Sequence, residues 1–138
     1  KVKSAQGDTN IFNITDPEKY RCQLVHYHNR LSRLYLAVYK GTDRASAPVF
    51  YLLFSDVGYM ECPVSWAGAQ FDIASGDDCI ALMLDRGLIG QAILQFPNAY
   101  ASITDHAKLY IGHTKGNSPI RIIANSANML QELPASML

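Results

Sequence analysis

The sequence has few charged residues and no excess of either sign. Only 17% of its 138 residues are Asp, Glu, Lys or Arg, against roughly 25% in a typical soluble domain. The 12 basic side chains balance the 12 acidic ones, so the formal net charge is zero. Such a chain lacks the positive electrostatic field that would attract a phosphate backbone, so we expect no nucleic-acid partner.

Cysteine is also scarce, and long apolar runs are missing. The three cysteines, Cys22, Cys62 and Cys79, are odd in number and show no C-x-x-C spacing, which argues against a disulfide framework or a thiolate zinc site. This use of cysteine predicts a reducing compartment, the cytoplasm. The longest nearly unbroken apolar run, residues 79–84, is far too short to cross a bilayer, so we expect no membrane partner.

Recognisable catalytic motifs are missing as well. There is no nucleophile elbow of the G-x-S-x-G type, and Asp105-His106 is only half of a catalytic triad. Asp77-Asp78-Cys79 places a thiol at a predicted helix start, but two adjacent carboxylates oppose formation of the thiolate. We therefore favour a protein that is not an enzyme and that has no cofactor.

The length of the chain fits one domain. Residues 1–10 are polar and show no periodicity, which predicts a flexible N-terminal segment. No linker or internal repeat divides the remainder, so we predict a single globular domain over residues 11–138.

Short apolar or alternating stretches recur along the chain, with turn residues between them. This pattern predicts strands that fold back as antiparallel hairpins. Residues 64–73 are either two short strands or one strand with a bulge at Gly68, and residues 90–96, which fit neither period cleanly, are assigned as a strand. The other predicted strands cover residues 20–28, 34–39, 49–54, 59–61, 108–113 and 120–124.

One helix is predicted after residue 75. Ser75 supplies a hydroxyl cap, and Asp77 and Asp78 place negative charge at the positive end of the helix dipole. Gly87 is suited to the left-handed residue that ends a helix, so we expect the helix to stop near Arg86.

A second helix is predicted near the C-terminus, where Asn125 or Ser126 is a possible cap and Pro134 stops the helix after Leu133. The predicted fold class is therefore α+β, a mainly antiparallel β-sheet or partly open barrel of about seven to eight strands with two short helices. The predicted core residues are Leu34, Leu36, Val38, Phe50, Leu52, Phe54, Ile80, Leu82, Leu109, Ile111, Ile120 and Ile122.

Aromatic residues gather in the middle of the chain, at Tyr51, Tyr59, Trp66 and Phe71. Residues of this type line apolar ligand pockets and form interface hot spots, although packing in the core is the alternative for most of them. The segment 62–69 around Trp66 is poor in charge yet broken by Pro and Gly. Because such a connection is costly to expose, we predict that it is buried under a helix or against a second subunit.

Histidines provide the one suggestion of a metal site. His26 and His28 share a face if residues 20–28 form a strand, so that their imidazoles are placed to hold one transition metal. A third ligand is required, and His113 lies on another predicted strand, with His106 shortly before it. The alternative is a pair of partly exposed histidines on a polar sheet face.

Two functional hypotheses follow from these observations. The first is a small non-enzymatic regulatory or protein-interaction domain that acts as a homo-oligomer, most simply a dimer, because weakly charged copies repel each other little. A protein partner or a small apolar ligand would then bind around Trp66. The alternative is a metal-binding protein or enzyme whose site is assembled from His26, His28 and His113.

Overall fold

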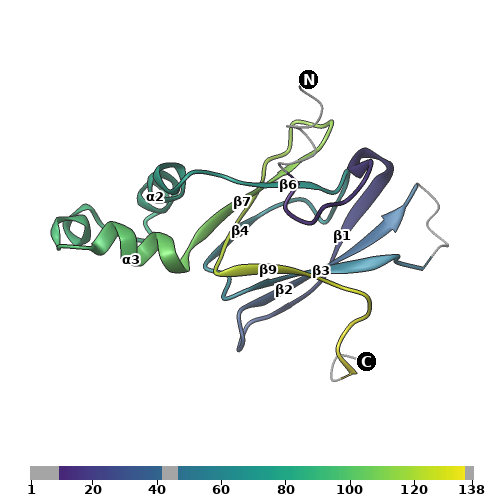
Figure 1. The fold of residues 1–138 in the computed structure, drawn as a ribbon, viewed down its shortest axis with the longest axis horizontal. Coiled ribbons are helices and arrows are strands. Elements are labelled where there is room, and N and C mark those ends of the chain that lie inside the picture. The colour runs from purple at the N-terminus through teal and green to yellow at the C-terminus, as the bar shows by residue number, and fades with distance from the viewer. Residues whose placement is uncertain (1–9, 42–46, 136–138) are drawn as a thin grey trace.

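The computed structural model describes residues 10–41 and 47–135. Within these residues nine strands form two antiparallel sheets, accompanied by two α-helices (Figure 1). The predicted α+β class with mainly antiparallel pairing is confirmed. The strands pair as two separate sheets and do not close into a barrel. Apart from Asn10, the N-terminal segment predicted to be flexible lies outside the described residues.

The first sheet has the order β5-β1-β2-β3-β9 and the second has the order β4-β8-β7-β6. In the first sheet the strands are β1 (Tyr20–His28), β2 (Arg33–Lys40), β3 (Phe50–Ser55), β5 (Ser65–Ala67) and β9 (Ser126–Leu130). In the second sheet they are β4 (Tyr59–Glu61), β6 (Gln70–Ile73), β7 (Lys108–His113) and β8 (Ile120–Ala124). The chain crosses between the sheets several times, so both depend on pairing between distant segments.

The main core lies between the two sheets. Alternate residues of each strand point inward, as the two-residue period of a strand requires. Phe54 of the first sheet contacts Phe71 and Tyr110 of the second, with ring centroids 5.5 and 5.4 Å apart. All of the predicted core residues except Phe50 and Ile111 are buried, and those two are half-buried.

Helix α2 (Gly76–Asp85) covers part of the outer face of the second sheet. Cys79 and Leu82 of the helix pack against Leu109 and Ile123, whose side chains point away from the main core. The Ser75 hydroxyl accepts a hydrogen bond from the Asp78 backbone N–H at 3.1 Å, which confirms the predicted cap. No helix in the described part of the chain is long and apolar enough to cross a membrane.

The C-terminal helix predicted over residues 125–133 is wrong, because residues 126–130 form strand β9. This strand pairs with β3 from Tyr51 to Ser55, so tertiary pairing overrides the local cap signal. The second helix is instead α3 (Ala99–His106), which sequence reasoning missed. Residues 91–95, within the stretch assigned as a strand, form a short 3₁₀-helix, η2 (Gln91–Gln95).

Candidate functional site

The most unusual region of the molecule follows helix α2. Residues 87–104, which contain η2 and most of α3, include no Asp, Glu, Lys or Arg. We call this segment the helical lobe. In Figure 1 the lobe lies at the end of the molecule that carries α2 and α3, away from the first sheet.

The helical lobe exposes its apolar side chains. None of its residues is buried, and η2 and α3 contribute nothing to either core cluster. Phe96 is 67% exposed, and Tyr100, Ile93 and Leu88 are 45%, 41% and 40% exposed. Four exposed large apolar side chains thus fall within one uncharged segment, and clusters of exposed apolar side chains are typical of surfaces that contact another molecule.

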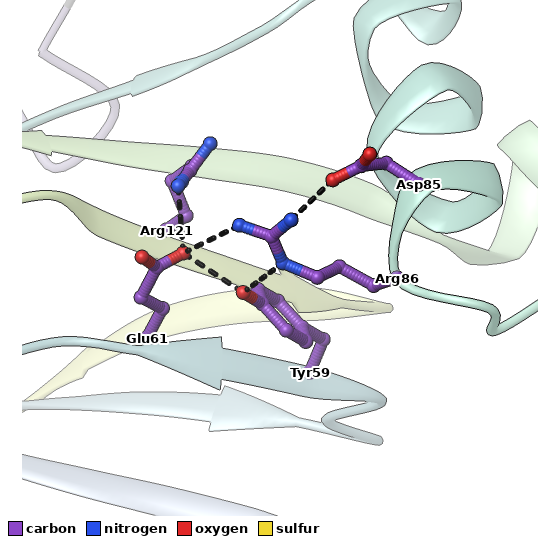
Figure 2. Close-up of polar contacts among 5 residues, drawn as sticks. All are labelled: Tyr59, Glu61, Asp85, Arg86 and Arg121. Atoms are coloured by element: carbon purple, nitrogen blue, oxygen red, sulfur yellow. Dashed lines mark hydrogen bonds and ion pairs between the residues drawn. The ribbon is translucent and has the colours of Figure 1, made fainter.

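A polar cluster fixes the start of the lobe to the body of the protein, and Figure 2 shows its members. We call it the Glu61 cluster; it consists of Tyr59, Glu61, Asp85, Arg86 and Arg121. Arg86, the last residue before the lobe, donates from Nε to the Tyr59 hydroxyl at 3.0 Å. The same guanidinium pairs with Asp85 and lies 3.8 Å from Oε1 of Glu61. The cluster therefore connects the end of α2 to strands β4 and β8.

Glu61 is the centre of this cluster. Its Oε1 accepts a hydrogen bond from the Tyr59 hydroxyl at 2.8 Å and lies 2.8 Å from a guanidinium nitrogen of Arg121. The hydrogen bond from Tyr59, followed by that from Arg121, holds the pKa of the Glu61 carboxyl below its usual value. The carboxylate is therefore ionised at neutral pH and can hold both arginines.

A second contact fixes the other end of the lobe. The Tyr100 hydroxyl donates to Oδ1 of Asp77 at 2.6 Å, and this hydrogen bond raises the pKa of Tyr100. A Cβ atom at Gly76 would come within 2.8 Å of the same hydroxyl and 3.2 Å of the Thr104 methyl group, so α3 approaches the start of α2 closely at this glycine. The lobe is thus held at both ends while its apolar side chains face solvent.

The aromatic residues proposed from the sequence do not form one surface. Trp66 and Phe71 lie in the main core, 6% and 0% exposed, with ring centroids 6.3 Å apart. Tyr59 belongs to the Glu61 cluster, and Tyr51 is half-buried on β3. In the segment 62–69, Trp66 is buried but Val64 is 69% exposed.

The histidines are divided between the two sheets. The rings of His26 and His28 on β1 are 5.9 Å apart. His113 is on β7 of the other sheet, and its Nε2 lies 2.7 Å from Oδ2 of Asp72. Across residues 10–41 and 47–135, no group of three or more His, Cys, Asp or Glu residues is arranged to hold a metal ion.

Comparisons with protein-family models, with curated proteins and with solved structures found no match to this chain. Sequence reasoning missed the helical lobe because residues 90–96, which fit neither period cleanly, were assigned as a strand. The signal that could have found it is the absence of charge from residue 87 to residue 104.

Proposed function

We propose that this protein is a non-enzymatic interaction domain that self-associates through the helical lobe, with a second copy of the chain as its partner. The observation that carries the proposal is an uncharged segment of helices with no buried residue and with Phe96, Tyr100, Ile93 and Leu88 exposed. The cytoplasm remains the proposed location, supported by the three cysteines, which are all free thiols.

Apolar exposure is costly in the separate monomer. Each large apolar side chain removed from water contributes about 1.5–3 kcal/mol when burial is complete. The side chains of the lobe are only partly buried in the monomer, so they gain only part of this free energy. The contacts of Arg86 and Tyr100 hold the backbone of the lobe near its two ends. A surface that is arranged before binding loses less entropy on association.

Charge favours a second copy as the partner. In a two-fold symmetric interface, residues near the axis face their own counterparts, so a charged surface would bring like charges together. The lobe has no charged side chain and avoids this cost. The formal net charge of zero also removes long-range repulsion between copies.

Sedimentation velocity over a range of protein concentrations tests this proposal. We expect the wild type to form a dimer as concentration rises, and Phe96→Glu to weaken the dimer at least tenfold, because the charge would be buried beside its own counterpart. Val64→Glu is the matched control, since Val64 is 69% exposed, close to the 67% of Phe96, and lies outside the lobe. A wild type that stays monomeric at millimolar concentration contradicts the proposal, as does equal weakening by both substitutions.

A further inference from the structure

A groove lies at the edge of the second sheet, at the other end of the molecule from the helical lobe. It is open to solvent and has a volume of about 1020 Å³. One wall is the segment before β1, and the other comprises β6 and the first residues after β7. Its lining includes Thr15, Asp16, Glu18, Asp72, His113 and Lys115.

Backbone contacts fix the two walls relative to each other. The Ala69 N–H donates to the Pro17 carbonyl at 3.0 Å, and the buried Asn10 side chain donates to the Ala69 carbonyl at 3.4 Å. Gly68, in the floor, has a φ of 105°, and a Cβ there would come within 2.9 Å of the His113 carbonyl oxygen. The groove is therefore formed before any ligand binds.

Most of the charged groups in the groove are already paired. Asp72 accepts one hydrogen bond from Gln70 at 2.8 Å and its Oδ2 lies 2.7 Å from Nε2 of His113, while Asp16 pairs with Lys19 at 3.6 Å. Glu18 and Lys115 have no ion-pair partner within the described ranges, and they lie on opposite walls. The groove thus presents a carboxylate on one wall and an ammonium group on the other.

We propose that this groove binds a short peptide with free termini, whose amine faces Glu18 and whose carboxylate faces Lys115. Cavities of about 300–1,000 Å³ take ligands of drug size, which corresponds to a few amino-acid residues. The Asp72 carboxylate orients His113, whose other ring nitrogen is available to hydrogen bond a peptide group. This site is separate from the dimer surface and does not depend on it.

Titration of ¹⁵N-labelled protein with trialanine, followed by amide chemical shifts, tests the proposal. We expect shifts at residues 113–115, and roughly threefold to tenfold weaker binding when the peptide is N-acetylated or C-amidated, because each change removes one exposed charge contact. Equal binding of the free and blocked peptides would overturn the proposal. So would the absence of shifts in the groove at 10 mM trialanine, whatever the oligomeric state of the protein.

Two substitutions test which wall of the groove contacts each terminus of the bound peptide. In Lys115→Gln the free and C-amidated peptides should bind equally, and in Glu18→Gln the free and N-acetylated peptides should do so. Lys40→Gln and Glu132→Gln are matched controls, because both residues are exposed and lie outside the groove lining. If the controls reduce the preference for free termini as much as the groove substitutions do, the effect is one of overall charge and the assignment of the termini is wrong.

Discussion

The body of the protein, by which we mean the two sheets and helix α2, buries many of its large apolar side chains, whereas the helical lobe exposes several of them. Between the sheets, Phe54, Phe71, Leu36 and Leu52 are completely buried. In the lobe, a segment that is also rich in apolar residues buries none of them, and Phe96 is 67% exposed. The two regions are joined by polar contacts of the Glu61 cluster and of Tyr100.

This difference indicates that apolar side chains contribute to folding in the body and to association in the lobe. Removing an aromatic ring from the core leaves a cavity and loses its burial, so the folded monomer depends on such rings. The Phe96 ring of the lobe has little burial to lose, and folding alone does not explain why this side chain is apolar. Substitutions matched between the two regions separate a contribution to folding from a contribution to association.

The largest expected difference is between Phe54→Ala and Phe96→Ala. The first should lower the free energy of unfolding by about 3–5 kcal/mol, because the Phe54 ring is completely buried. The second should change it by less than about 1 kcal/mol, because the Phe96 ring has little burial to lose. Urea unfolding at protein concentrations where the wild type is monomeric measures both values.

The affinity of the dimer is the control measurement for Phe54→Ala and Phe96→Ala. Phe96→Ala should weaken association by roughly tenfold or more, as expected for an aromatic residue near the centre of an interface. If Phe96→Ala lowers the stability of the monomer as much as Phe54→Ala does, the ring is buried in solution and the contrast between the two regions is wrong.

A matched pair of glycines gives a smaller effect. Gly68→Ala should destabilise the body by about 1–3 kcal/mol, because its φ of 105° disfavours a side chain and the new Cβ would approach the His113 carbonyl oxygen. Gly90 of the lobe has a φ of −101° and no atom within 4 Å of a new Cβ. Gly90→Ala should therefore leave stability unchanged or raise it by up to about 1 kcal/mol. Thermal unfolding of both variants decides whether the body is the more constrained region, and equal losses would contradict this.

Much of the body could be predicted because its strands carry their own pattern. Residues 108–113 and 120–124 are short stretches rich in strand-forming residues, are separated by a polar turn, and form β7 and β8 with the predicted bounds. Helix α2 could also be predicted because its sequence signals are local: its cap and its acidic first turn lie within a few residues of Ser75. Residues 126–130 were misassigned because their partner is β3, far away in the sequence, and no local signal encodes that pairing.

The surfaces were harder to predict than the elements. Whether an aromatic residue such as Trp66 faces solvent depends on which sheet covers it, and here it packs on Phe71 of the other sheet. Glu18 and Lys115 are distant in sequence, and only the fold places them on opposite walls of one groove. The lack of charge over residues 87–104 is visible in the sequence, but only the structure shows that the apolar side chains of this segment are exposed.

The smallest expected effect concerns the contact between the two regions, at the Glu61 cluster. The pKa of Glu61 is lower in the folded protein than its ordinary value of 4.5. The carboxylate therefore stabilises the fold above that pH, and this contribution is lost as pH falls from about 5 through the lowered pKa. Glu61→Gln should cost about 0.5–1 kcal/mol at pH 7, in the range of surface ion pairs, and less at pH 3. Urea unfolding at both pH values measures the change, with Glu132→Gln as the control. A cost that stays constant with pH would show that the charge of Glu61 does not hold the lobe to the body.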